Sequence, residues 1–125
     1  MTIRSMSDKE IAEKTVWRYT ADLKKEDGTA VAPADLSTLT LTVYAQDTAL
    51  TIINGLNAAN ILNAGRGTLD AAGKLTIVLA GDDLALVDPA AAYEDHVMLI
   101  QGTYASGTRF ARHEVYHRVI NLAKV

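Results

Sequence analysis

The chain has 125 residues, of which 49% are hydrophobic, and twelve basic against fifteen acidic side chains give it a net charge of −3 at pH 7. This length fits one domain, and because cysteine is absent, disulfides, a zinc ribbon and a thiol nucleophile are excluded. The slight acidic excess argues against a general binder of nucleic acid or anionic membranes. No apolar run reaches the roughly 18 residues that span a bilayer, and the polar start lacks the apolar region of a secretory signal, so we expect a soluble protein.

The N-terminal segment, residues 1–14, is polar, with scattered apolar side chains at Ile3, Met6 and Ile11. Within it, Ser7-Asp8-Lys9-Glu10 fits a capping box, which is a start signal for a short helix through Glu13. We expect an arm that is mobile or is ordered by a partner, and we take Ile3, Met6 and Ile11 as candidate partner contacts. A single folded domain is expected over residues 15–125.

From Thr15 onward the period of the apolar residues changes to two, which is typical of half-buried β-strands. Five segments show this pattern or a high content of β-forming residues: 15–23, 36–44, 74–80, 93–104 and 108–122. Trp17 and Tyr19 share the apolar face of the first of these segments. Ala105-Ser106-Gly107 is a hairpin-type connection, so the last two segments are expected to pair antiparallel.

The remaining segments carry weaker signals. Residues 48–53 are a candidate short strand, and the Asn-rich and Gly-rich stretch 57–67 is expected to be an irregular loop with one short strand near Ile61. Residues 81–89 predict a single helical turn capped by Asp82 and stopped before Pro89. With six or seven strands and no long helix, the fold class is all-β, an antiparallel β-sandwich.

One stretch, His113-Glu114-Val115-Tyr116-His117, matches the zinc-peptidase pattern H-E-x-x-H. That pattern needs a helix, because positions i and i+4 then lie on one face and both imidazoles reach one ion. On a strand, four residues place the two histidine Cα atoms about 13 Å apart, too far for zinc–nitrogen bonds near 2 Å. The β-branched residues around the motif favour a strand, with His113, Val115 and His117 on one face.

A catalytic zinc ion also needs a third protein ligand. The residues after His117 contain no His, Glu, Asp or Cys, and recruiting His96 from upstream would be a new geometry. We therefore interpret the motif as architectural.

Three other groupings are interpreted in the same way. Glu94-Asp95-His96 is expected to begin a strand at the sandwich rim, because consecutive strand residues point to opposite faces and form no triad. Gly65-Arg66-Gly67 lacks the rest of a phosphate loop. No calcium-loop pattern surrounds Asp82 and Asp83. We expect no metal, no cofactor and no catalytic residue.

Arg109, Arg112 and Arg118 crowd the last predicted strand, with Glu114 between them. Two interpretations stay open: an edge strand blunted by charge, or a surface that docks on an acidic neighbour. We take the three arginines as candidate interface residues.

The chain contains five segments in a characteristic order: LTLTV (39–43), DAAGKLTIVL (70–79), EDH (94–96), YASGTR (104–109) and HEVYHRVINL (113–122). In this order the chain resembles the small Ig-like β-sandwich proteins of tailed-bacteriophage virions, over roughly residues 15–122. The D-x-x-G-x-L-T turn and strand and the terminal H-E-V strand recur in that group as architecture. The resemblance implies roles in fold and contact, and no catalysis, for Asp70, Gly73, Glu94, His96, His113, Glu114 and Asn121.

The expected function is therefore that of a non-enzymatic virion structural protein, located in the virion and assembled in the bacterial host cytoplasm. Its expected partners are capsid, portal or connector, or tail subunits and further copies of itself, and neither nucleic acid nor membrane. Its position as a capsid decoration or at the head-to-tail connector is the first hypothesis. A tail or baseplate protein, a surface carbohydrate-binding β-module built on Trp17, Tyr19 and Tyr104, and an H-E-x-x-H zinc peptidase are the alternatives.

Overall fold

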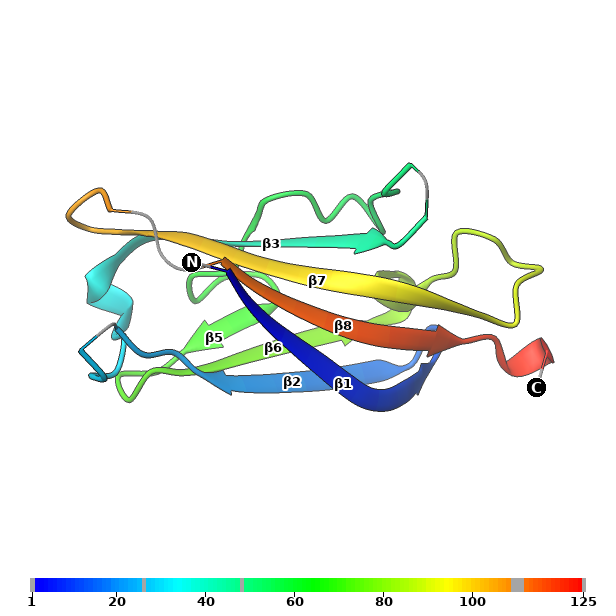
Figure 1. The fold of residues 1–125 in the computed structure, drawn as a ribbon, viewed down its shortest axis with the longest axis horizontal. Helices are drawn as coiled ribbons and strands as arrows, with labels where there is room; N and C mark the ends of the chain where they lie inside the picture. The colour runs from blue at the N-terminus through cyan, green and yellow to red at the C-terminus, as the bar shows by residue number, and fades with distance from the viewer. Residues whose placement is uncertain (1, 26, 48, 109–111, 125) are drawn as a thin grey trace.

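The computed structural model describes residues 2–25, 27–47, 49–108 and 112–124, and it describes side chains from Glu10 to Ala123 within these ranges. The described chain is all-β, with short 3₁₀ turns and no α-helix (Figure 1). The strands are β1 (Thr2–Ala12), β2 (Val16–Asp22), β3 (Leu36–Ala45), β4 (Ala59–Asn60), β5 (Gly67–Leu69), β6 (Lys74–Ala80), β7 (Tyr93–Tyr104) and β8 (Arg112–Ile120). The 3₁₀ turns are η1 (Pro33–Asp35), η2 (Gly81–Leu84) and η3 (Leu122–Lys124).

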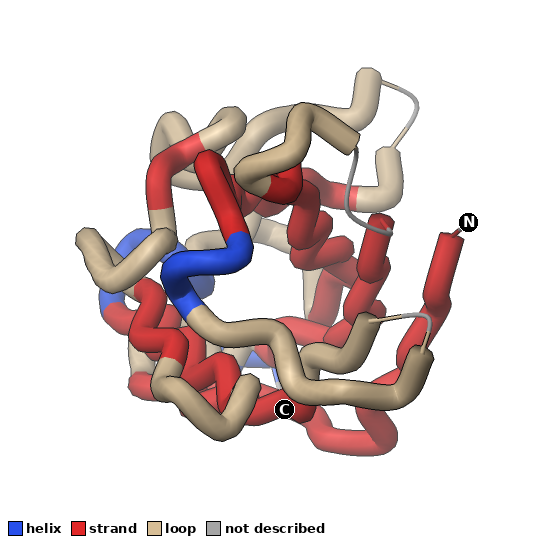
Figure 2. The backbone as a smooth tube through the Cα atoms, turned by 90° about the vertical axis from the view of Figure 1, so that its left-hand side faces the viewer, coloured by secondary structure: helices blue, strands red, loops and turns tan. Residues whose placement is uncertain are grey.

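The strands form two sheets that face each other. One sheet has the order β1-β8-β7-β3-β4 and the other has the order β2-β6-β5. Figure 2, a view from one end, shows the strands of both sheets arranged around a shared interior. In immunoglobulin domains strands A, B, E and D form one sheet and G, F and C the other, and variable-type domains add C′ beside C. Strands β2 to β8 follow that order, with β4 in the place of C′, whereas β1 lies in the larger sheet and pairs parallel with β8. The expected all-β sandwich is therefore confirmed, and the parallel β1–β8 pair differs from the purely antiparallel arrangement expected.

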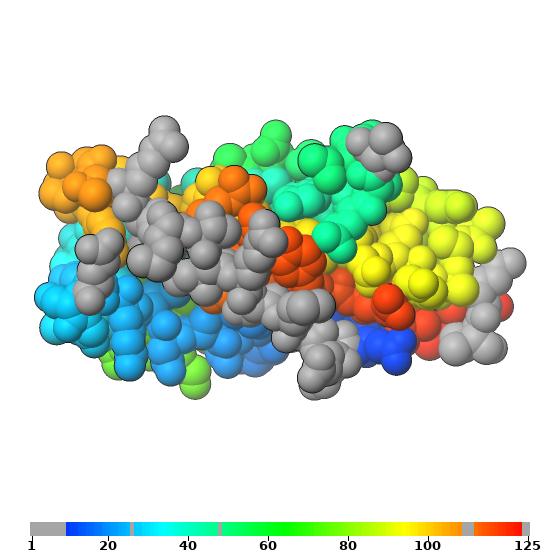
Figure 3. Space-filling model, in the orientation of Figure 1, coloured from blue at the N-terminus to red at the C-terminus, as the bar shows by residue number. Residues whose placement is uncertain are grey.

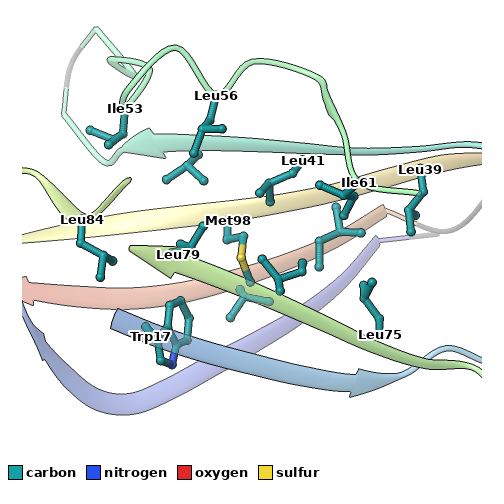
Figure 4. Packing of buried hydrophobic residues seen from close by; sticks show 14 of the residues in the cluster. Trp17, Leu39, Leu41, Ile53, Leu56, Ile61, Leu75, Leu79, Leu84 and Met98 are labelled. Atoms are coloured by element: carbon teal, nitrogen blue, oxygen red, sulfur yellow. The ribbon is translucent and has the colours of Figure 1, made fainter. Parts of the chain in front are cut away.

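The core lies between the sheets and follows the period-two pattern. Alternate residues of β3 and β6 are fully buried, among them Leu39, Leu41, Leu75 and Ile77. Figure 4 shows Leu39, Leu41 and Leu75 between the two layers, together with Met98 of β7. Because a strand points successive side chains to opposite faces, each strand contributes every second residue to this core. Despite the many alanines in the sequence, Ala45 is the one buried alanine among the described side chains, so leucine, isoleucine and valine build the core.

The N-terminal segment differs from the sequence-based expectation. It forms no helix at residues 7–13; residues 2–12 are β1, which pairs parallel with β8 at the edge of the larger sheet. Ile11 lies opposite Val119 and is 6% exposed within the core. The capping box does not lead to a helix here, because strand pairing satisfies the backbone groups at the free edge of β8 and buries an apolar side chain. β1 therefore belongs to the same sheet as β8, β7 and β3, and the chain passes to the other sheet at β2.

Two loop expectations are also corrected. The candidate strand at residues 48–53 is absent from its described part, where a single bridge joins Tyr44 and Ile52. The helical turn is present as η2, but the side chain that accepts a backbone hydrogen bond at its start belongs to Asp83, from Ala80 N–H at 3.2 Å, rather than to Asp82. Strand β5, like β1, was not expected.

Gly67, at the start of β5, allows the close approach of the 61–66 loop. A Cβ at this position would collide with the carbonyl oxygen and Cβ of Ile61. We expect Gly67→Ala to lower the free energy of unfolding by about 2–3 kcal/mol, measured by urea denaturation. Gly55→Ala is the control, because its Cβ meets nothing within 4 Å and only its φ of +68° is strained, at a cost of about 1 kcal/mol. Equal losses for the two variants would contradict the steric explanation.

Candidate functional site

The H-E-x-x-H segment lies in a strand. Residues 113–117 are part of β8, where His113 is opposite Ile100 and His117 is opposite His96. Strand geometry separates His113 and His117 by about 13 Å along the chain. The helical arrangement on which the zinc-peptidase pattern depends is therefore not the one that this chain adopts.

The imidazoles of His96, His113 and His117, here called the histidine cluster, point into the interior. His96 is 0% and His117 is 2% exposed. Their ring centroids lie 5.8 Å apart in a T-shaped arrangement, and the ring of Trp17 lies 4.7 Å from that of His117. His113 is next along the face, with Nε2 3.4 Å from the hydroxyl of Tyr19. The cluster thus continues the core toward β2 with heteroaromatic rings.

Burial lowers the pKa of two members of this cluster. The pKa of His117 is lowered to about 4 by burial and then by neighbouring His96, against the opposing effects of the Val115 backbone and Asp95. Burial also lowers the pKa of His113. Both ring nitrogens of His117 and Nδ1 of His96 have no hydrogen-bond partner among the described residues. An imidazolium at position 117 would be desolvated, so His117 is neutral at pH 7.

Glu94 and Asn121 fix the loop that precedes β7. The two carboxylate oxygens of Glu94 accept from the backbone N–H groups of Val87 (2.8 Å) and Asp88 (2.7 Å), and Oε1 also lies 2.9 Å from Nε2 of His96. The Asn121 amide donates to the carbonyls of Pro89 and Ala91. These polar side chains do structural work at the sandwich rim, as the sequence implies for Glu94. The Glu94–His96 pair was not expected, although a spacing of two on a strand indicates a shared face.

A second polar centre joins the residue before β5 to the 3₁₀ turn η2, which follows β6. The guanidinium of Arg66 donates to both oxygens of Asp83, at 2.6 and 2.8 Å, and the Asn54 amide also donates to Asp83 at 2.8 Å. Asp83 is 3% exposed. Arg66, from the Gly65-Arg66-Gly67 segment, thus binds Asp83. Among the described residues no group of three His, Cys, Asp or Glu side chains is placed to hold a metal ion.

The outer face of β7 and β8 carries paired charges. Arg112 lies 3.3 Å from Glu114, which also accepts from the Tyr116 hydroxyl at 2.8 Å. Arg118 pairs with Asp95 at 2.9 Å, and its guanidinium carbon lies 4.0 Å from the centroid of the Tyr93 ring. We call Tyr93, Asp95, Arg112, Glu114, Tyr116 and Arg118 the outer charged face. Figure 3 shows β7 (yellow) and β8 (orange to red) side by side on this surface, with the end of β1 (blue) below them.

The candidate interface residues fall into three groups. Arg112 and Arg118 are on the outer charged face, with side chains 44% and 41% exposed. Ile11 differs from the expectation, because it packs into the chain's own core. Ile3 and Met6 belong to the backbone of β1, their side chains lying outside the described ones, and Arg109 lies outside the described residues altogether.

The aromatic platform expected of a carbohydrate-binding module does not form from the residues proposed for it. Trp17 is 7% exposed, and Tyr19 and Tyr104 are partly buried against the core. Tyr93, at 50% exposed, is covered on one side by Arg118.

Comparisons of the chain with protein families, with curated proteins and with solved structures gave no match. No helix among the described residues has the length and apolar character to cross a membrane.

Proposed function

We propose that this chain is a non-enzymatic structural protein of a tailed-bacteriophage virion, an Ig-like module that assembles in several copies on the capsid or the head-to-tail connector. The observation that carries the proposal is the outer charged face beside β1. It presents exposed arginines at the edge of a sheet that is completed by the N-terminal strand. Exposed charges suit docking on a neighbouring subunit of complementary charge, because electrostatic complementarity fixes the orientation of the two partners.

The use of the polar residues supports a structural role. The side chains that would serve a hydrolase are engaged in the fold: His113 and His117 in the core, and Glu114 with Arg112 and Tyr116. The strand order itself does not choose a function, since the same sandwich serves many unrelated ones. The virion proposal is therefore supported by the resemblance of the sequence pattern and by the outer charged face together.

The test is to locate the chain in particles. Virions from a phage that encodes this sequence are purified through a density gradient, and the chain is quantified by mass spectrometry against the major capsid protein. We expect more than one copy per particle, and labelling with an antibody against the chain at the capsid surface or the neck. Absence from purified particles, with the chain recovered only in the soluble lysate, would overturn the proposal.

A further inference from the structure

We propose that β1 is exchanged between neighbouring copies of this chain, so that residues 2–12 of one copy pair with β8 of the next. The inference rests on the proposed multi-copy assembly and specifies what joins the copies. β1 is the first strand of the chain and pairs with β8 alone among the described strands. It can therefore leave its sheet without breaking any other strand pair.

The connection between β1 and β2 is short and strained. Lys14 has a φ of +57°, the left-handed region that a residue with a side chain disfavours. The N–H and hydroxyl of Thr15 donate to the carbonyl of Ala12, at 3.4 and 2.6 Å, and close a tight turn. If this connection, here called the hinge, became extended, Lys14 would return to an ordinary backbone conformation. Short hinge loops under strain favour the exchange of the element that they connect.

The pairing of β1 is also divided into two short segments. Residues 2–6 pair with residues 112–116, and residues 10–12 pair with residues 118–120, so residues 7–9 lie opposite His117 alone. Such an irregularity interrupts the ladder of hydrogen bonds. The backbone hydrogen bond that joins the hinge to η2, donated by Lys14 N–H to Leu84 C=O, is long at 3.3 Å. β1 is therefore held against its own β8 by fewer interactions than an uninterrupted strand with a relaxed turn would make.

The occupant that best fits a vacated β8 edge is β1 of a second copy. Ile11 is buried beside Val119, and Glu13 N–H donates to Ile120 C=O at 2.9 Å. Exchange reproduces each of these contacts in the neighbour, because every copy has the same β8 edge and the same β1 register. A foreign strand would have to match both. Exchange also gives Ile11 the partner-facing role that its sequence position suggested, inside the core of the next copy.

A cysteine pair distinguishes closed from exchanged β1. Ala12 and Ile120 are cross-strand partners, and because the chain has no cysteine, Ala12→Cys/Ile120→Cys forms only this pair. The variant is oxidised over a range of concentrations, separated by size-exclusion chromatography with light scattering, and analysed by non-reducing electrophoresis. We expect disulfides between chains in the oligomeric fractions and within chains in the monomer. Each single-cysteine variant controls for random cross-linking.

Hinge variants change the balance in opposite directions. Lys14→Gly accepts the left-handed φ without strain and should lower the exchanged fraction roughly fivefold. Lys14→Pro, with φ fixed near −65°, excludes the closed turn and should raise that fraction.

Three outcomes would count against the inference. Oligomers that contain only disulfides within chains would overturn exchange and leave the proposed assembly standing. A monomer at every concentration, with disulfides only within chains, would overturn both. If the cysteine variant does not fold, the hinge variants in the cysteine-free chain decide, and unchanged monomer-to-oligomer ratios in both would overturn exchange.

Discussion

Replacing Asp83 by alanine is expected to lower the free energy of unfolding by about 3 kcal/mol, because the carboxylate is the shared acceptor of a buried polar centre. The change removes its bonds from Arg66 (2.6 and 2.8 Å), Asn54 (2.8 Å) and Ala80 N–H (3.2 Å). Loss of one partner of a buried ion pair costs about 3–5 kcal/mol, and the lower end applies here because Arg66 can turn to water. The Arg66 side chain is already 35% exposed. Urea denaturation at pH 7 measures the loss.

The control for Asp83→Ala is Arg118→Met, which breaks an exposed ion pair. Arg118 and Asp95 have side chains 41% and 44% exposed, and such pairs contribute about 0–1 kcal/mol. A loss for Asp83→Ala no larger than that for Arg118→Met would contradict the buried-centre explanation.

A double-mutant cycle isolates the ion pair itself. Arg66→Met should cost nearly as much as Asp83→Ala, because it leaves a buried carboxylate without its cation. The double variant should lose less than the sum, with a coupling energy of about 1–3 kcal/mol. Burial alone raises the pKa of Asp83, but the bonds from Arg66, Asn54 and Ala80 outweigh it and hold that pKa below its usual range. The contribution of Asp83 is therefore fully present above its unfolded pKa near 4, and is lost only as the pH falls further, through the folded value.

The sandwich was predictable because its central strands carry a strong period-two pattern. Leu75, Ile77 and Leu79 are fully buried while the residues between them are not, and strand β7 has the bounds expected from residue type. Two of the edge strands, β1 and β5, were not predictable. β1 and β5 lack a clean alternation, and they form because β8 and β6 offer edges to pair with. Edge pairing is a tertiary effect that local propensity does not contain.

The histidine cluster was only half predictable. The period of two places His113 and His117 on one face, and the structure puts that face in the core. The contact with His96 depends on register. Counting back from the hairpin, where Tyr104 N–H donates to Thr108 C=O, puts Tyr116 opposite His96. The β7–β8 ladder is shifted by one residue from that register and pairs His96 with His117. A shift of one residue exchanges the two faces of a strand, so this contact needed the structure.

Mild acid is expected to destabilise the protein through His117 and His113. The pKa of His117 is about 4 in the folded chain, against an ordinary value of 6.5. The unfolded chain therefore binds more protons between these values, and stability is full above pH 6.5 and falls as the pH drops toward 4. Each unit costs about 1.4 kcal/mol, so His117 alone accounts for about 3 kcal/mol by pH 4. His113, whose pKa burial also lowers, adds to the loss in the same direction.

His117→Leu should reduce by about one the number of protons taken up on unfolding in mild acid. The variant should also be at least as stable as the parent at pH 7.5. The reason is that it replaces an imidazole whose ring nitrogens have no hydrogen-bond partner by an apolar side chain of similar volume. The groups around His117 are His96, which Glu94 contacts, the carboxylate of Asp95, and Trp17 of β2, and they are unchanged in the variant. Val115→Ala, on the same face of β8, is the control and should lower stability by a constant amount at every pH. Urea denaturation between pH 4.5 and 7.5 separates the two. Because the Asp83 carboxylate gives up its contribution only below about pH 4, an unchanged slope in His117→Leu would show that the acid sensitivity does not come from His117.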